Sequence, residues 1–508
     1  MTSILTNTSS LVALQTLKNI NSSLNTVQSE ISTGKTIATA RDNAAVWAIS
    51  KVMESDVKGF KGISDSLSLG SSTLTVAREA TETITDLLTQ MKGKIVAAQG
   101  ENIDRGKLQT DVQVLRDQIA GIVSAAQFSG LNMVSGTEDV NFLASLDRSG
   151  AGVSVSEITI ARQDMTTGAG VFGTGTSLDP NLTVLNAATA VSETGKSAAL
   201  TFTGVWDENE TASITIAGTE LTYMAAADAT ANTAVADYFS GAINALGLEG
   251  VTASVAAGVL TVTSTRAFEG LAVQVVEGAA AGGLTITNVN GAAPASPTSA
   301  TISQRAEQIA FSTVAAVNDG DSYRVTVGTN SYSYVAGKGE TMKDVANGLK
   351  IAIDSTAPEG ITTKVSQDAT TGAWTLSIDN DGTSAASFAL SRSGNAGGTA
   401  SGGLFGLDSI DVTTDQGARA ALDNIETMIN TAIDSAAEFG SAQNRIDTQR
   451  GFVSALSDAM TAGIGTLVDA DMEEASARLQ ALQVQQQLGI QALSIANQQP
   501  QNLLALFR

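Results

Sequence analysis

The 508-residue chain contains neither cysteine nor histidine. Without cysteine it can form no disulfide and offers no thiolate nucleophile, and without histidine it lacks the usual imidazole acid or base. Zinc sites built from cysteine and histidine, and Ser-His-Asp triads, are excluded for the same reason. Because these absences remove most enzyme classes, we expect a protein that is not an enzyme.

Basic residues are also scarce. The chain has 28 Lys and Arg against 51 Asp and Glu, which gives a net charge of −23. Phosphate backbones and anionic lipid surfaces attract clustered positive charge, so this balance argues against nucleic-acid and membrane partners. No run of about 18 apolar residues could span a bilayer. The N-terminus has no basic segment followed by an apolar one, so we also expect no cleaved signal peptide.

Proline is rare, and its positions divide the chain. The stretches 1–179 and 359–499 contain no proline, and the five prolines are Pro180, Pro294, Pro297, Pro358 and Pro500. Because proline interrupts helices, the two long arms without it are expected to be helical. The Gly- and Thr-rich middle is instead typical of strands and turns. The expected fold class is therefore mainly α, with inserted α+β or β domains.

Both arms carry apolar residues at alternating spacings of three and four. Such spacing is typical of coiled coils and long bundle helices, and ordinary amphipathic helices of a globular bundle stay an alternative. We expect the arms to pair into a helical core. The positions expected in its coiled coil are Leu74, Ile84, Leu88, Met91, Ile95, Leu108, Leu115, Ile425, Ile429, Val453 and Leu456.

The two ends of the chain have almost no charge. Residues 1–40 contain three charged side chains and residues 479–507 contain none, although the second stretch has nine glutamines. Val484, Leu488 and Ile495 lie off its main apolar stripe, and a helix that is apolar on more than one side needs several partners. We interpret both ends as assembly surfaces, formed by Leu17, Ile20, Leu24, Val27, Ile31, Leu479, Leu482, Leu488, Leu493, Ile495, Leu503, Leu504 and Phe507.

The middle of the chain repeats itself. Between residues 190 and 410, β-branched residues alternate with turn residues, as in 213–218 and 323–328. Each copy predicts the order β-β-α-β-β, so we expect two tandem small α+β domains over 175–295 and 298–407. The matched positions include Ile214 with Val325, Ile216 with Val327, Tyr223 with Tyr334, Val235 with Val345 and Ile243 with Ile353.

No short motif supports catalysis. Gly168–Gly173 matches the glycine pattern of a dinucleotide-binding loop, but Pro180 follows where a helix should begin. Gly34–Thr36 lacks the upstream glycine of a phosphate loop, because Ser29 stands at that position. Asp379–Gly382 lacks the spacing and the closing glutamate of a calcium loop. We therefore expect no catalytic, cofactor-binding or metal-binding residues.

Both ends contain long ordered segments that point to one family. The N-terminal segments include Ile31-Ser-Thr-Gly-Lys and Arg41-Asp-Asn-Ala-Ala-Val-Trp-Ala-Ile, and Ala126-Gln-Phe-Ser-Gly-Leu-Asn follows them. The C-terminal segments include Leu467-Val-Asp-Ala-Asp-Met-Glu-Glu and Leu503-Leu-Ala-Leu-Phe-Arg. With these segments the chain resembles bacterial flagellins, in particular alphaproteobacterial ones that form complex filaments.

This resemblance implies a structural subunit that polymerises into the helical flagellar filament used for swimming. It implies an inner coiled-coil domain from 1–40 with 465–508, and a helical core domain from 41–170 with 408–464 that includes a β-hairpin. It also implies secretion to the extracellular flagellum without a cleaved signal. The implied partners are further copies of the chain, the export apparatus, an export chaperone, the filament cap, hook-junction proteins and other flagellins.

Three other functions remain to be weighed. A hook–filament junction protein shares the terminal coiled-coil pattern and is the main alternative. An enzymatic flagellin with a zinc peptidase insert would need the motif His-Glu-x-x-His, which a chain without histidine cannot supply. The repeated outer domains could add an adhesive or lateral-contact role to the filament function.

Overall fold

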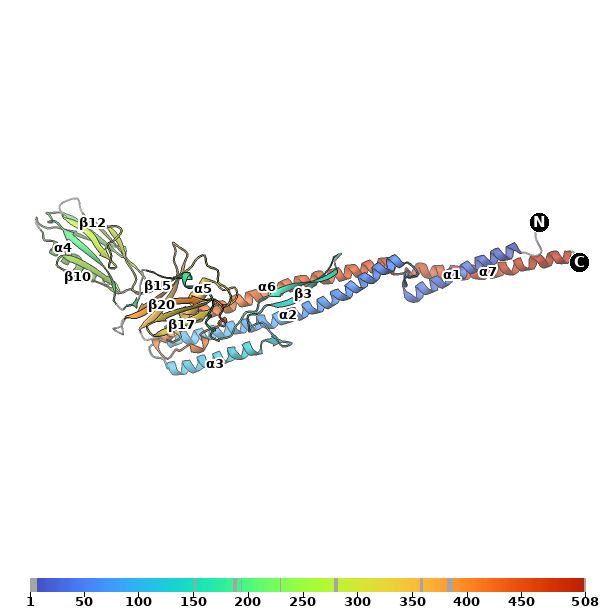
Figure 1. Ribbon diagram of the computed structural model, residues 1–508, viewed down its shortest axis with the longest axis horizontal. Helices are drawn as coiled ribbons and strands as arrows, with labels where there is room; N and C mark the ends of the chain where they lie inside the picture. Colours follow the sequence, from blue (N-terminus) through green and yellow to red (C-terminus); the bar gives the residue numbers. More distant parts are fainter. Residues whose placement is uncertain are drawn as a thin grey trace. The chain divides into compact units, whose positions relative to one another are not determined.

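The computed structural model describes residues 7–149, 152–185, 190–192, 194–228, 230–277, 282–356, 360–381 and 387–506. By their internal contacts these residues form two compact units. Unit 1 comprises residues 1–74, 140–160 and 441–508, and unit 2 comprises residues 75–139 and 161–440. The long helices α2 (Ala44–Ala98) and α6 (Asp415–Val468) contribute residues to both units. Figure 1 labels the elements along the chain.

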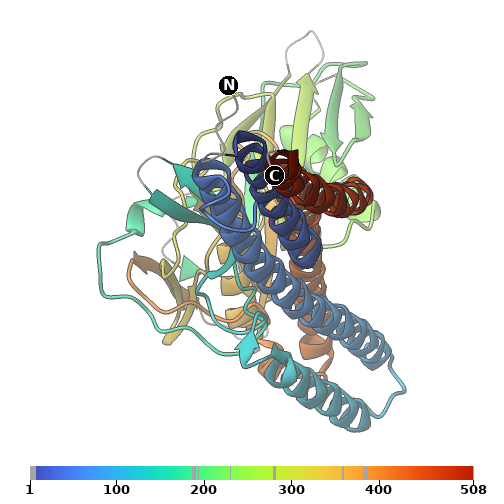
Figure 2. The same cartoon turned by 90° about the vertical axis from the view of Figure 1, so that its right-hand side faces the viewer.

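Unit 1 contains the two terminal helices, α1 (Thr8–Thr33) and α7 (Met472–Leu506), which lie side by side (Figures 1 and 2). The Asn7 side chain caps α1 by accepting a hydrogen bond from the Ser10 backbone, and Gly34 ends the helix in a left-handed conformation. The segments after α1 and before α7 are tied together. Thr36 donates to the Val468 carbonyl at 2.8 Å, and Ala470 donates to the Gly34 carbonyl at 2.9 Å.

A β-hairpin completes unit 1. Its strands β3 (Val140–Ser149) and β4 (Gly152–Ile160) are antiparallel, with a register shift between Leu143 and Ser145. Phe142 is buried, and a Cβ at Gly70 of α2 would lie 2.7 Å from its ring. Gln449 of α6 donates to the Ala144 carbonyl at 2.9 Å. The hairpin is therefore packed against both long helices, at a point where α2 has no side chain.

The helical part of unit 2 consists of the second half of α2, helix α3 (Arg105–Ala125) and the first half of α6. A short hairpin of β1 (Gln127–Phe128) and β2 (Leu131–Asn132) follows α3. The side-chain amide of Gln109 bonds the backbone of Ile410 at 3.0 Å and of Val412 at 2.8 Å. These contacts attach α3 to the segment that leads into α6.

The β-rich part of unit 2 contains two similar sandwiches. In the first copy, β7, β8 and β9 precede helix α4, and five strands follow it. The sheet orders are β10-β11-β7-β13 and β14-β12-β8-β9. The bounds are β7 (Lys196–Thr203), β8 (Thr211–Ile216), β9 (Thr219–Met224), α4 (Asn232–Ala245), β10 (Val251–Ala256), β11 (Val259–Ser264), β12 (Leu271–Glu277), β13 (Gly283–Val289) and β14 (Ser299–Ile302).

The second copy has the corresponding orders β18-β19-β15-β5 and β17-β16-β20-β6. It contains helix α5, and the short 3-10 helices η1 and η3 lie at the borders of this region. The bounds are η1 (Asp179–Asn181), β5 (Leu182–Val184), β6 (Ala190–Val191), β15 (Glu307–Phe311), β16 (Ser322–Val327), β17 (Asn330–Val335), α5 (Met342–Asp354), β18 (Ile361–Gln367), β19 (Trp374–Asn380), β20 (Phe388–Asn395) and η3 (Leu407–Ser409).

The sheets divide this region differently from the sequence expectation. Strands β5 and β6 precede the whole first copy in sequence, yet they pair with β15 and β20 of the second copy. The first copy is thus inserted into the second, whereas we expected two domains in tandem. Each copy also has more strands than the expected order β-β-α-β-β.

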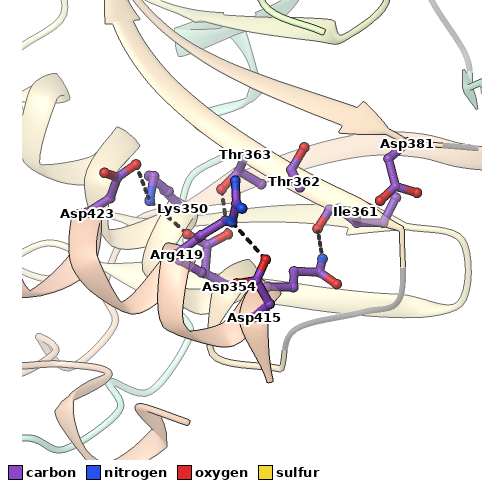
Figure 3. Close-up of a pocket in the computed structure, with 11 residues that line it drawn as sticks. Lys350, Asp354, Ile361, Thr362, Thr363, Asp381, Asp415, Arg419 and Asp423 are labelled. Atoms are coloured by element: carbon purple, nitrogen blue, oxygen red, sulfur yellow. Dashed lines mark hydrogen bonds and ion pairs between the residues drawn. The ribbon is translucent and has the colours of Figure 1, made fainter. Parts of the chain in front are cut away.

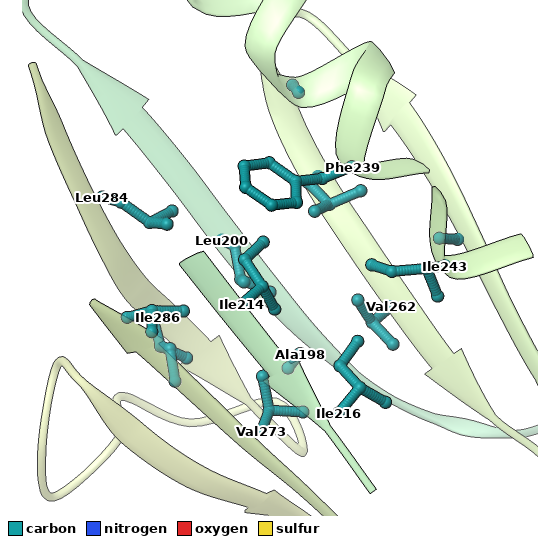
Figure 4. Close-up of a cluster of buried hydrophobic side chains, with 14 of the residues drawn as sticks. Ala198, Leu200, Ile214, Ile216, Phe239, Ile243, Val262, Val273, Leu284 and Ile286 are labelled. Carbon is teal, nitrogen blue, oxygen red and sulfur yellow. The ribbon is translucent and has the colours of Figure 1, made fainter. Parts of the chain in front are cut away.

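Each sandwich is held by its own apolar core. In the first copy, Leu200 and Ile214 come from the two sheets and meet Phe239 of α4 in one buried cluster (Figure 4). In the second copy, Tyr323 and Val325 of β16 cluster with Leu349 of α5. Strands β7 and β11 alternate buried and half-buried residues, so their sheet turns one face inward, which is the period-2 pattern expected of a half-buried strand.

Candidate assembly surface

The terminal stripe predicted from the sequence lies along the seam between α1 and α7. Val27 is buried, and the other four predicted α1 residues are half-buried. On α7, the predicted residues Leu479, Leu482 and Leu493 are also half-buried. A Cβ at Gly489 would lie 3.1 Å from the Leu17 side chain, so the two helices approach closely there. The residues of this seam contact one another within a single chain.

Polar side chains fix the register of the pair. Gln486 donates to the Asn21 side-chain oxygen at 2.6 Å, in the middle of the seam. At its far end, Asn7 donates to the Ala496 carbonyl and Ser10 to the Asn497 side chain, both at 2.8 Å. A shift by one turn would break all three bonds, so the amide groups specify one alignment in a seam that has little charge.

The apolar side chains of α1 and α7 that are more than half exposed lie outside the seam, and we call this set the outer face. Among the predicted residues, Leu488 and Ile495 belong to it, with exposed fractions of 57% and 65%. Leu11, Val12 and Ile490 lie equally exposed but were not among the predicted site residues. Their signal in the sequence is weak, because single exposed apolar residues are common on soluble proteins. The whole outer face consists of Leu11, Val12, Val484, Leu488, Ile490 and Ile495.

Three predicted residues lie at the very end of the chain. Leu503 and Leu504 belong to the helical backbone of α7, and the structure does not describe their side chains. Phe507 lies outside the described residues. Their assignment to the assembly surface stays a prediction.

The predicted coiled-coil positions lie mostly in the interior of the two units. Eight of them are buried, and Leu108, Leu115 and Leu456 are half-buried. In unit 2, Lys92 of α2 forms an ion pair with Glu426 of α6 beside this core. The buried residues are Leu74, Ile84, Leu88, Met91, Ile95, Ile425, Ile429 and Val453.

Nothing in the described part of the chain forms a cluster of three or more Asp or Glu residues suited to a metal ion. A cavity of about 350 Å³ lies beside α5 and the start of α6, lined by both acids and bases (Figure 3). Helix α6 contains an 18-residue window with a mean hydropathy of 1.3, which is apolar enough to cross a membrane by length and composition. Core helices of soluble proteins pass the same test, so the absence of a membrane partner stays a prediction.

Comparison with known proteins decides the family. The model of the bacterial flagellin N-terminal helical region matches residues 4–139, and that of the C-terminal helical region matches residues 422–507. Flagellin A of Rhizobium meliloti is 30% identical over 512 residues, which covers 100% of both chains. The chain belongs to the bacterial flagellin family.

Other relatives agree with this assignment. Flagellin FljK of Caulobacter vibrioides is 41% identical over 171 residues, which cover 33% of this flagellin and 63% of the relative. A solved hook-associated protein-3 from Legionella pneumophila covers 82% of the chain at 9% identity, with a TM-score of only 0.34. The full-length relatives are flagellins, so the hook–filament junction alternative is not favoured. This flagellin is a structural subunit of the bacterial flagellar filament.

Proposed function

We propose that helices α1 and α7 are the assembly element of the filament and that their outer face is buried only by other copies of the chain. The observation that supports this most directly is the exposure of six apolar side chains on two helices that carry almost no charge. Full burial of one such side chain stabilises by about 1.5–3 kcal/mol. A repeating, non-closing contact between identical subunits would bury all six in every subunit.

The experiment is electron microscopy of full-length protein under salting-out conditions, beside a variant that lacks 1–40 and 465–508. We expect tubes from the full chain and monomers from the truncated one. If the full chain caps hook ends and forms no tubes, the junction function replaces this proposal.

Point variants separate the outer face from the seam. The double change Leu488→Gln and Ile495→Gln should block polymerisation while the monomer stays folded, because neither side chain lies in the seam. The matched control is Gln485→Ala, an exposed α7 residue outside the apolar set. Polymerisation of the double variant at the wild-type concentration would refute the role of the outer face.

The finer domain assignment follows from the same proposal. The inner domain would be formed by 1–40 with 465–508, and the core domain by 41–170 with 408–464. The proposed environment of these domains includes the export apparatus, a chaperone, the filament cap, hook-junction proteins and other flagellins. Release of the subunit to the cell exterior belongs to this proposal as well.

We also propose a lateral contact between first copies, with adhesion as the alternative. The accessible side of sheet β10-β11-β7-β13 carries mostly hydroxyl groups, and strands β10, β11 and β13 contain no charged residue. Subunits with a net charge of −23 repel each other, so an uncharged surface is where neighbours can meet most easily. The surface includes Thr201, Thr252, Ser254, Thr261, Thr263 and Thr285.

The absence of native cysteine makes this contact testable by cross-linking. A Thr252→Cys variant should form cross-linked dimers in filaments but not in dilute monomer. The matched control is Thr362→Cys on β18 of the second copy. Equal cross-linking of the Thr252→Cys and Thr362→Cys variants would argue against the lateral contact. If neither variant cross-links but the filaments bind to surfaces, adhesion is favoured.

A further inference from the structure

Three side chains meet in a buried cluster that the filament function does not use. Lys350 and Asp354 lie one turn apart on α5, and Asn424 lies on α6. The Lys350 ammonium group Nζ is 2.8 Å from Asp354 Oδ2 and 3.0 Å from the amide oxygen Oδ1 of Asn424. The Lys350 and Asp354 side chains are 8% and 5% exposed. Figure 3 shows Lys350 and Asp354 together at the cavity.

We infer that Lys350 and Asn424 join in an intramolecular isopeptide bond, with Asp354 as the proton carrier. Asp354 takes a proton from the Lys350 ammonium, and the freed amine attacks the Asn424 side-chain carbon Cγ. The C=O electron pair moves to Oδ1 and then returns as the C–N bond to the amide nitrogen breaks. The attacking nitrogen passes one proton to the leaving nitrogen, which also takes the proton that Asp354 held and departs as ammonium. In the overall reaction, the Lys350 ammonium group and the Asn424 primary amide become a secondary amide, and a free ammonium ion is released.

The geometry supports the proton transfer from Lys350 to Asp354 and the approach of the amine to the amide. The hydrogen bond between Nζ and Oδ1 holds the amine beside the amide, which replaces a bimolecular encounter by a positioned one. Burial favours the neutral acid that carries the proton, because a low-dielectric surrounding penalises its charged form. Burial raises the pKa of the Asp354 carboxyl, while the Lys350 charge and the Thr363 hydroxyl oppose that rise.

The surroundings provide an exit for the leaving group. The cavity of about 350 Å³ is lined by Lys350, Asp354 and Asp423, so released ammonia has a path to solvent. The Asp423 carboxylate lies 3.7 Å from Nζ and is 66% exposed, so it remains solvated beside the opening. The alternative is that Lys350 forms an ion pair with Asp354 and a hydrogen bond with Asn424, and no covalent bond. These contacts would also hold α5 against α6, but the Lys350 and Asn424 side chains would stay unmodified.

Mass spectrometry of the denatured full-length protein, taken from filaments, tests the bond. We expect tryptic digestion to yield one branched peptide that contains both Lys350 and Asn424, with a mass lower than the sum of its parts by one ammonia. Recovery of the two peptides separately, at their full masses, would overturn the inference. Because the wild-type chain is measured, no folding defect can obscure the result.

Variants assign the roles. Asp354→Ala keeps both reacting groups, and loss of the proton carrier should slow bond formation by about 100-fold or more. Asn424→Asp should release water in place of ammonia, so the branched peptide keeps its mass while its deficit against the sum of the two separate peptides becomes one water. Asp423→Asn is the matched control and should leave the bond in place. An unchanged yield of branched peptide from Asp354→Ala would exclude Asp354 as the proton carrier.

Discussion

Helices α4 and α5 occupy the same position in the two outer copies, yet their surroundings differ. α5 is buried along most of its length, including Gly348 and Lys350. α4 buries one face only, and Tyr238 on its outward side is 46% exposed. The offset between the copies aligns Tyr238 with Gly348. At this matched position the buried helix α5 has glycine, the smallest residue, whereas the partly exposed helix α4 has tyrosine.

The aromatic contacts explain why glycine fits at this position in the second copy and tyrosine in the first. In the second copy, the Tyr334 ring lies over Gly348, and Phe405 packs against the same ring at 5.8 Å between centroids. In the first copy, Tyr238 itself packs against Tyr223 at 5.0 Å, with its hydroxyl bonded to the Thr222 carbonyl. In the second copy, Phe405 from another part of the chain packs against Tyr334. In the first copy, Tyr238 of α4 itself packs against Tyr223. The same sandwich is thus adapted to two environments by few residues.

The largest expected effect concerns a buried ion pair of the second copy. Arg305 binds both carboxylate oxygens of Asp379, at 2.8 and 2.6 Å, and Asp379 is 1% exposed. Asp379→Ala should cost about 3–5 kcal/mol, because it leaves a desolvated guanidinium without its partner. Calorimetric unfolding measures the loss. The control Glu269→Ala, at an exposed ion pair of the first copy, should change stability by less than about 1 kcal/mol.

The next effect tests the close contact at Gly348. A Cβ there would lie 2.3 Å from the Tyr334 ring, which is buried, so Gly348→Ala should destabilise the second copy by about 1–3 kcal/mol. Gly241→Ala on α4 is the matched change, since no atom lies within 4 Å of its Cβ. It should stabilise the first copy by about 0.5–1 kcal/mol through helix propensity. Changes in melting temperature of the same sign for Gly348→Ala and Gly241→Ala would contradict this difference between α5 and α4.

A pH effect should also arise in the second copy. Burial raises the pKa of Glu340 from 4.5 to about 7, although its bond from the Tyr334 hydroxyl lowers it. The folded state holds the proton more tightly, so this contribution to stability is complete below about pH 4.5 and is lost as the pH rises to about 7. Glu340→Gln should match wild type at low pH and be more stable by up to about 3 kcal/mol at higher pH. Parallel pH profiles in denaturant unfolding would contradict this.

The smallest effect concerns Tyr238 of α4, which packs against residues of its own copy. Tyr238→Phe removes only the hydroxyl bond to Thr222, so we expect a loss of about 0.5–1 kcal/mol. Tyr238→Ala should cost more, because the ring contacts with Tyr223 and Phe239 also disappear. Limited proteolysis of the α4 segment measures both. Equal susceptibility of the two variants would show that the ring does not close the first copy.

The sequence was most informative where a pattern extends over many residues. The alternating spacing of three and four predicted helical arms, and α1, α2, α3, α6 and α7 occupy them. Tyr223 and Tyr334, matched as repeat positions, lie on the corresponding strands β9 and β17. These features repeat locally, so neighbouring residues reinforce the signal.

Features that depend on distant pairs were not predictable. Strands β5 and β6 have three and two residues, too few to show any period, and their partners follow the whole inserted first copy. The contact of Phe405 with Tyr334, and that of Lys350 with Asn424, join positions about 70 residues apart with no local signal. The outer face of α1 was missed because Leu11 and Val12 lie outside the stripe that packs on α7.

Peptide-resolved hydrogen exchange of monomer and filament tests the central claim most directly. If the outer face of α1 and α7 is buried by neighbouring copies, amides in 8–33 and 472–506 should exchange at least about tenfold more slowly in filaments, as expected for an added stabilisation of about 1.4 kcal/mol or more. Exchange in the cores of both outer copies should change little. Equal exchange of the terminal helices in monomer and filament would contradict the claim.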